Sequence, residues 1–282
     1  GLVATVIACA VSAPVLASES VHLDKFPTEK MQSMPALQDG ARTFVNYCLN
    51  CHSASMMRFN RLQDIGLTDE QISGSLQFTE GRVGDLMKVA MRHEDGKAWF
   101  GAAPPDLSVE ARARASESGS GADWIYTYLR SYYRDGSRET GWNNAIFPNV
   151  GMPNPLWQWQ GMRGAVEERV APVTDEATGK VTGWTKTTIT YDREGNKSEK
   201  VEKVSGDGLH EGTHFTLGTP EGGTLSQAEF DDKVANLVAF MKFMSDPSAS
   251  TRGRLGIWVL LFIALFVGCT WWLNREYWKD IK

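Results

Sequence analysis

The fold depends first on the motif Cys48-Leu49-Asn50-Cys51-His52, because the surrounding chain must enclose the group that this motif binds. Two cysteines separated by two residues and followed directly by histidine form the attachment motif of a c-type haem. Each thiol can add across one haem vinyl group, and the short spacer places both sulfurs on one face of a helical turn. The neighbouring imidazole then lies where it can bind the iron. The sequence therefore predicts one covalently attached haem c on Cys48, Cys51 and His52.

Two other uses of the motif lack support elsewhere in the chain. A thioredoxin-like redox pair needs a βαβ pattern around it, and none surrounds this one. A zinc knuckle needs a second Cys/His pair of matching spacing. The other two cysteines, Cys9 and Cys269, lie in apolar segments at the two ends of the chain.

The composition is that of a globular protein. Of 282 residues, 42% are hydrophobic and 22% are charged, and 29 Lys and Arg against 34 Asp and Glu give a net charge of −5. The chain has no run of Lys or Arg, which argues against nucleic-acid binding. The slight acidic balance suits a basic partner.

The N-terminal end has the character of an export signal. Residues 1–18 carry no charge and are rich in Ala, Val and Leu, and small or apolar residues precede a possible cleavage after Ala17. We expect a secretory signal peptide at residues 1–17. The alternative is an uncleaved N-terminal membrane segment.

The C-terminal end has the character of a membrane anchor. Residues 255–274 carry no charge, and as a helix they would span about 30 Å, the thickness of a bilayer core. Tryptophan and tyrosine lie near both ends, as at a membrane interface. We expect a transmembrane anchor at residues 251–274. With an export signal, the haem domain at 18–250 then lies outside the cytoplasm and the tail at 275–282 inside.

The second axial ligand is sought among methionines and histidines, because a haem used for electron transfer has both axial positions filled. Met152 lies in Pro148-Asn149-Val150-Gly151-Met152-Pro153-Asn154-Pro155, where glycine and prolines forbid a regular helix and favour a stiff loop. From the residues alone the alternatives stay open; they are Met162, His93, His210 and His214.

The other methionines are explained more simply. Met56 and Met57 follow His52 too closely to reach the opposite haem face. Four more are expected in the core, two on a helix-like segment at 85–93 and two on a late helix; they are Met87, Met91, Met241 and Met244.

The periodicity predicts a mainly α body with a small β insertion. Helices are expected at 37–52, which carries the haem motif near its end, and at 122–134. A third begins at Ser226, where Glu229 completes a capping box, and stops at Pro247 before a linker at 248–254. Residues 164–223 are polar, and alternation at 185–191 and 198–204 predicts a β-hairpin. It is either a partner-contact arm or a tolerated surface insertion.

Together these motifs resemble cytochrome c1 of the bacterial type, the haem subunit of the quinol–cytochrome c oxidoreductase (cytochrome bc1) complex. The similarity covers most of residues 39–282 and rests on motifs in a fixed order. They are Cys48-Leu49-Asn50-Cys51-His52-Ser53 with residues 58–62, Pro104-Pro105-Asp106-Leu107-Ser108 with Arg112, Gly151-Met152-Pro153, and Leu225-Ser226-Gln227 opening a helix that ends at Asp246-Pro247. Residues 163–223 do not match the mitochondrial members, so the family's acidic docking patches are not transferred.

The resemblance implies a cytochrome-c-like haem domain in which His52 and Met152 bind the iron, Arg112 meets a propionate and Pro105 lies at the haem. On the residues alone, Arg112 and Arg114 are equally well explained as solvated side chains. The implied function is electron transfer from a Rieske iron–sulfur protein to a cytochrome c, with no standalone catalysis. The implied setting is a homodimeric complex with cytochrome b, its haem domain on the periplasmic side of the bacterial inner membrane.

Three other functions fit a haem motif and an anchor. An independent membrane-anchored cytochrome c would feed a terminal oxidase or a photosynthetic centre directly. A haem enzyme would keep its sixth position open, although the sequence offers no distal histidine motif. A structural anchor subunit would carry a vestigial haem.

Overall fold

The computed structural model describes residues 22–78, 81–175, 180–205 and 209–279, so the expected signal segment at 1–17 lies outside the described residues. The helical elements are η1 (Thr28–Gln32), α1 (Met34–Thr43), η2 (Phe44–Cys48), η3 (Phe59–Ile65), α2 (Asp69–Ser75), α3 (His93–Phe100), α4 (Glu110–Ala113), α5 (Gly121–Leu129), α6 (Trp157–Gln160), α7 (Gln227–Ser245) and α8 (Ala249–Tyr277). The strands are β1 (Ala54–Arg58), β2 (Leu86–Met87), β3 (Tyr132–Arg134), β4 (Trp142–Asn144), β5 (Ala165–Thr174), β6 (Val181–Tyr191), β7 (Lys197–Val204) and β8 (Gly212–Leu217).

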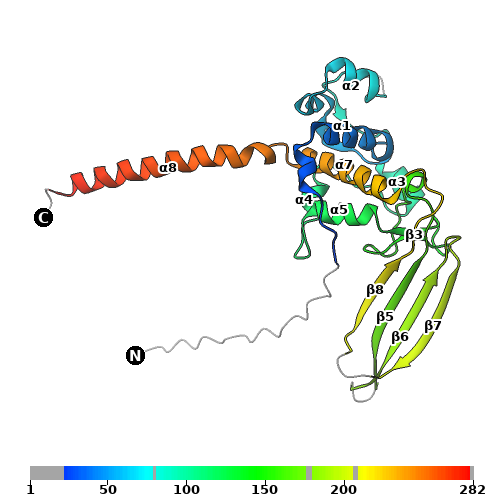
Figure 1. Ribbon diagram of the computed structural model, residues 1–282. Coiled ribbons are helices and arrows are strands. Elements are labelled where there is room, and N and C mark those ends of the chain that lie inside the picture. The colour runs from blue at the N-terminus through cyan, green and yellow to red at the C-terminus, as the bar shows by residue number, and fades with distance from the viewer. Residues whose placement is uncertain (1–21, 79–80, 176–179, 206–208, 280–282) are drawn as a thin grey trace, which may run out of the picture.

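Helix α7 is the central element of the body, and α1 and α5 lie beside it (Figure 1). It starts with the expected capping box, in which Ser226 and Glu229 bond each other's backbone N–H. Its expected apolar side is buried; the residues are Phe230, Val234, Leu237, Val238 and Met241. Helix α1 packs closely on it, with the rings of Phe44 and Phe240 5.5 Å apart.

The helix that leads into the haem motif changes pitch before it ends. Helix α1 runs into η2, a π-helix in which the N–H of Leu49 bonds the carbonyl of Phe44 at 3.0 Å. Single π-turns are rare and are found mostly at functional sites. The expected helix at 37–52 is confirmed up to Cys48, and the last residues of the motif form a tighter turn.

Helix α5 is shorter than expected. A capping box of Ser120 and Asp123 starts it, and it ends at Leu129, although the periodicity had predicted helix to residue 134. Residues 132–134 instead form β3, which pairs antiparallel with β4. Buried Asn144 on β4 donates its amide to the carbonyl of Tyr128 at 2.8 Å, which takes up one helix-end carbonyl.

The expected helix at 85–93 is wrong. Leu86 and Met87 form β2, which pairs with β1, and α3 begins only at His93. Met87 lies opposite Ala54 and is fully buried, so its role in the core is confirmed although its secondary structure is not.

The insertion is a four-stranded antiparallel sheet in the order β7-β6-β5-β8. The expected hairpin is its β6–β7 pair, in register from Tyr191↔Lys197 to Trp184↔Val204. The sheet projects from the helical body as an arm (Figure 1). Its two ends meet where the N–H of Gly218 bonds the carbonyl of Gly164 at 3.0 Å. Body and arm are therefore joined through a narrow base.

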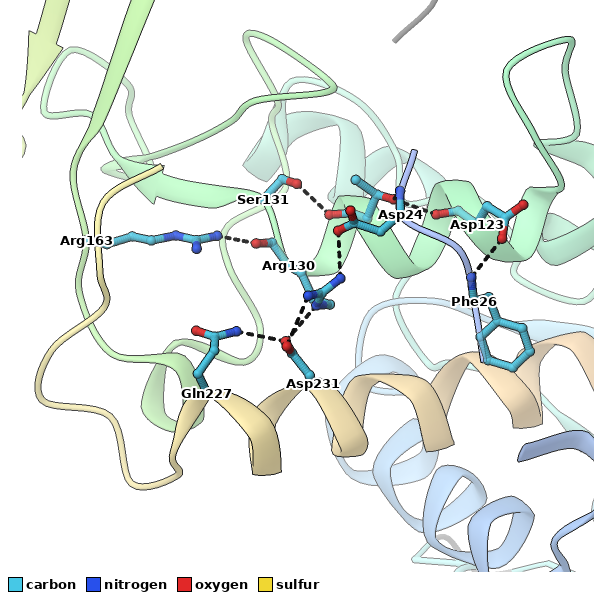
Figure 2. Close-up of polar contacts among 9 residues, drawn as sticks. Asp24, Phe26, Asp123, Arg130, Ser131, Arg163, Gln227 and Asp231 are labelled. Atoms are coloured by element: carbon cyan, nitrogen blue, oxygen red, sulfur yellow. Dashed lines mark hydrogen bonds and ion pairs between the residues drawn. The ribbon is translucent and has the colours of Figure 1, made fainter. Parts of the chain in front are cut away.

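Arg130 ties three segments of the body together (Figure 2). It follows the end of α5, and its guanidinium lies 2.7 Å from Asp24 and 2.6 Å from Asp231 of α7. The described N-terminal segment is held further by the N–H of Phe26, which donates to Asp123 at 2.8 Å. These bonds fix α5 against α7.

Among the described residues, α8 is the one helix long and apolar enough to cross a membrane. The candidate span is Thr251–Tyr277, with mean hydropathy 2.1 and none of its most apolar window buried against the body. The expected linker at 248–254 belongs almost entirely to α8, which begins at Ala249. The break between α7 and α8 is short and contains Pro247.

Candidate haem site

The haem motif folds as a turn that gathers its three functional side chains. The carbonyl of Cys48 accepts the N–H of Cys51 at 3.1 Å and that of His52 at 2.9 Å. Cys48 is buried and Cys51 half-buried, and both thiols are free. Burial raises the pKa of Cys48 to about 12, so its sulfur is a neutral thiol before it reacts.

His52 is held in one orientation and one tautomer. Its Nδ1 lies 2.8 Å from the carbonyl oxygen of Pro105. A carbonyl can only accept, so Nδ1 carries the hydrogen and Nε2 keeps a free lone pair for a metal. Burial lowers the pKa of His52, although the bond to Pro105 opposes the shift, which favours the neutral imidazole.

The segment that carries Pro105 is fastened to the segment after the haem motif by Asp106. Its carboxylate accepts the N–H of Ser55 at 2.8 Å and the Ser55 hydroxyl at 2.6 Å. The N–H of Leu107 bonds the carbonyl of Ser53 at 2.8 Å. Pro105 is itself exposed, so its backbone carbonyl rather than its ring contributes to the site.

Met152 lies in a loop without helix or strand, as expected. Asn149 three residues earlier has φ 63°, in the left-handed region that asparagine tolerates. Arg138 donates to the Asn149 carbonyl at 2.9 Å, and Asn143 accepts its N–H at 2.9 Å. The loop is therefore held from both sides.

Two tyrosines hold Met152 directly, and the sequence analysis assigned neither of them to the site. The Tyr128 hydroxyl lies 3.5 Å from the Met152 sulfur, and the Tyr132 hydroxyl lies 3.3 Å from the Met152 carbonyl oxygen. The two hydroxyls are 2.7 Å apart. The four-residue spacing of these tyrosines was the one hint in the sequence, since on a helix it would place two side chains on one face, but Tyr132 follows the end of α5 and lies on β3.

The alternative axial ligands differ from Met152 in their surroundings, although Met162 packs against the same hydrophobic core. Met162 is half-buried and its backbone pairs with Glu221 at the base of the arm. The three histidines are exposed; they are His93, His210 and His214.

The arginines of α4 and its end differ in surroundings. Arg112 is exposed, and its charge contributes to a lowered pKa of Asp246. Arg114 is half-buried, pairs with Glu110 at 2.8 Å and lies 4.6 Å above the Trp124 ring. Trp124 stacks on Tyr128 at 4.9 Å, so Arg114 adjoins the aromatic group that holds Met152.

The donor set fits a covalently held haem. Two free thiols lie on one turn, an imidazole beside them has a free Nε2, and a thioether packs against the same hydrophobic core that contains Cys48. Nitrogen and thioether ligands suit low-spin iron. With the apolar C-terminal helix, fold and site define a c-type cytochrome built to be anchored in a membrane.

Comparison with known proteins gives the family. Residues 26–163 match the model of the Cytochrome C1 family. A cytochrome c1 of Allochromatium vinosum is 34% identical over 281 residues, 99% of this chain and 98% of that protein. A protein of Nitrosomonas europaea named ammonia monooxygenase gamma subunit is 39% identical over 272 residues, 95% of this chain and 94% of that protein. A cytochrome b/c1 of Bradyrhizobium diazoefficiens is 22% identical over 87% of this chain and 33% of that protein. The chain belongs to the cytochrome c1 family.

The resemblance drawn from the sequence is thereby confirmed, and the mainly α fold with it. The protein is a haem c electron-transfer subunit of the cytochrome bc1 complex and carries one covalently attached haem c, for which Cys48 and Cys51 are in place. The apolar helix α8 agrees with a membrane-anchored subunit.

Proposed function

We propose that the protein relays single electrons from a Rieske iron–sulfur protein to a cytochrome c. The observation that carries this proposal is that Met152 is held at both its sulfur and its carbonyl oxygen, which supports a sixth ligand supplied by the chain itself. A filled sixth position favours outer-sphere electron transfer over binding of a substrate at the iron.

The residues divide the work as follows. Cys48 and Cys51 attach the cofactor, His52 and Met152 bind its iron, and Pro105 fixes the His52 ring through its carbonyl. When bound, the haem supplies a one-electron couple between ferric and ferrous iron. The chain excludes water from this centre by burying Cys48 and His52.

A propionate partner is proposed from the arginines near Trp124. The resemblance points to Arg112, whereas the surroundings favour Arg114, because its guanidinium is half-buried beside the aromatic group around Met152. Arginine suits a propionate because its planar fork can donate two parallel hydrogen bonds. Replacing each by Gln separately and measuring the midpoint potential of the covalently held haem would identify which one binds, because removing the cation beside a propionate should lower that potential.

The surrounding arrangement is part of the proposal. Residues 1–17 are a signal peptide, 18–250 a periplasmic haem domain with its insertion at 164–223, 251–274 the anchor and 275–282 a cytoplasmic tail. Cytochrome b is the neighbour in the membrane, and the complex is a homodimer in the bacterial inner membrane. The name of the relative cytochrome b/c1 supports cytochrome b as a partner.

The first experiment is the optical spectrum of the wild type and of Met152→Ala, oxidised and reduced, with and without carbon monoxide. We expect the haem of the wild type to be low-spin and not to bind carbon monoxide, and the haem of Met152→Ala to bind it. Met162→Ala is the matched control and should behave as wild type. A wild type that binds carbon monoxide contradicts the relay and favours a haem enzyme.

A second candidate follows from the name of the Nitrosomonas europaea relative, which assigns that protein to an ammonia monooxygenase. Purification of the full chain in mild detergent separates the two. Recovery with a cytochrome b and an iron–sulfur protein supports the bc1 assignment. Recovery with monooxygenase subunits, and without a cytochrome b, contradicts it. Recovery alone favours an independent anchored cytochrome.

A further inference from the structure

Tyr128 has a fixed ring and a hydroxyl that points at one atom. Its ring stacks on Trp124 at 4.9 Å and meets Tyr132 and Phe147 edge-on, with ring centroids 5.3 and 6.3 Å away. Three aromatic contacts leave little freedom for the ring, so the direction of its hydroxyl is set by packing. That hydroxyl lies 3.5 Å from the sulfur of Met152.

The two tyrosines form a directed chain of hydrogen bonds. Tyr132 is fully buried, and its single proton has two acceptors: the oxygen of Tyr128 at 2.7 Å and, more distant, the carbonyl oxygen of Met152 at 3.3 Å. The shorter contact makes Tyr128 the main acceptor. Each phenol has one proton, so the proton of Tyr128 is then free to be donated to the sulfur. The proton donors therefore follow one another from Tyr132 to Tyr128 to Met152.

The backbone around this chain is rigid. Two side chains bond the Tyr132 carbonyl, Gln160 at 3.1 Å and Arg163 at 2.8 Å. Asn144 holds the Tyr128 carbonyl at 2.8 Å. A hydrogen bond from Tyr128 to the sulfur can thus persist in both redox states without rearrangement of the chain.

We infer that Tyr128 is a positioning and tuning residue, whose hydroxyl bonds the Met152 sulfur and so raises the reduction potential of the haem. The inference rests on the proposed role of Met152 as sixth ligand. A thioether sulfur has two lone pairs, one for the iron and one that can accept a hydrogen bond. A donor at the second pair withdraws electron density, so the sulfur stabilises ferric iron less than it otherwise would.

The test compares Tyr128→Phe with wild type in the full chain within its membrane complex. Phenylalanine keeps the ring and its packing and removes only the hydroxyl. We expect the midpoint potential to fall by an amount equal to about a fivefold change in the ratio of oxidised to reduced protein, the size expected for one modest hydrogen bond. At 59 mV for each tenfold change, this is roughly 40 mV. The sulfur-to-iron charge-transfer band of the oxidised protein should persist and move in wavelength.

Two further variants sharpen the result. Tyr132→Phe removes the donor to Tyr128 and should lower the potential less, in the same direction. Tyr126→Phe is the matched control, because this tyrosine lies on the same helix but packs on Phe26 and under Arg130, away from Met152. It should leave both potential and band unchanged.

Three results would overturn the inference. One is a Tyr128→Phe protein with the potential and band of wild type. Another is a Tyr126→Phe protein shifted as much as Tyr128→Phe, which would make the effect general. The third comes from the proposed function, since a Met152→Ala protein that stays closed to carbon monoxide shows that the sulfur is not a ligand. The last failure is distinguishable because it is measured without any tyrosine variant.

Discussion

One hydrogen bond sets the orientation and the tautomer of the His52 ring. Its Nε2 is free because a backbone carbonyl holds Nδ1, and that carbonyl depends on Asp106 keeping the segment after Pro105 against Ser55. Asp106 does not bond the His52 ring, but through the position of the Pro105 carbonyl it controls the orientation of that ring. The orientation of a metal ligand is commonly set by such outer contacts.

Replacing Asp106 by Asn should lower the free energy of unfolding by about 2 kcal/mol at neutral pH, because charge-assisted hydrogen bonds to Ser55 and Ser108 are lost. Burial raises the pKa of Asp106, but these hydrogen bonds more than offset it and hold the pKa below its usual value. A lowered pKa means that the stabilisation is complete above the unfolded value of about 4 and is lost as pH falls through the folded value. The difference in the free energy of unfolding between wild type and Asp106→Asn should therefore become smaller as the pH falls.

Urea unfolding of the holoprotein from pH 7 to pH 3 measures this difference. Asp95→Asn is the control, since Asp95 pairs with exposed Arg92 at the surface, and the substitution should leave the free energy of unfolding nearly unchanged. If the free energies of unfolding of wild type and Asp106→Asn differ by the same amount at every pH, the charge of Asp106 does not stabilise the fold and this prediction is wrong.

At the scale of elements, the contact between α1 and α7 sets the position of the haem motif. A side chain at Gly40 would overlap the carbonyl of Asn236 and come within 2.8 Å of Phe240 Cβ. Close approach of two backbones at this glycine lets η2 carry Cys48 into the core beside α7.

Gly40→Ala should destabilise the protein by about 1–3 kcal/mol or more, because α1 must move away from α7. Gly74→Ala on α2 is the matched change, with nothing within 4 Å of the added carbon, and should be neutral or stabilising by up to about 1 kcal/mol. Thermal unfolding of both variants, followed by haem absorption and by circular dichroism, measures the effect. Equal midpoints for the two alanine variants would contradict the close packing described.

At the scale of the whole molecule, the chain is a haem-binding body with an anchor at one end and a β arm at its side. The arm contacts the body through Tyr133, whose ring lies 5.0 Å from Tyr191 and 5.9 Å from Phe215. The turn between β6 and β7 also touches the body, where the N–H of Gly136 bonds the carbonyl of Gly195 at 2.8 Å.

His52 and Met152, the expected axial ligands, lie outside the arm, whereas the alternative ligand His214 lies on β8 and is exposed. The arm is therefore separable from the haem site in structure.

Excision of residues 165–217, joining Gly164 to Gly218, should leave the haem spectrum and the closed sixth position unchanged. The two glycines are already hydrogen-bonded, so the joint needs little rearrangement. Stability should fall, because Tyr133 loses its buried contacts, and Tyr133→Thr in the shortened chain should limit that exposure. Carbon monoxide binding by the shortened protein would instead show that the arm helps to hold Met152.

The chemistry of the site and the order of the segments can be predicted from the sequence alone. The motif Cys48-Leu49-Asn50-Cys51-His52, the capping box at Ser226, the hairpin at 185–204 and the apolar stretch at 255–274 are local patterns, and local patterns are sufficient where neighbouring residues make the interaction. Only the tertiary structure decided how far α5 extends, that residues 85–93 are not helical, and that β5 and β8 complete the sheet. It also brought together residues that touch at the proposed haem site: His52 with Pro105, and Met152 with Tyr128. These contacts join residues distant along the chain, and their geometry comes from packing that no single segment contains.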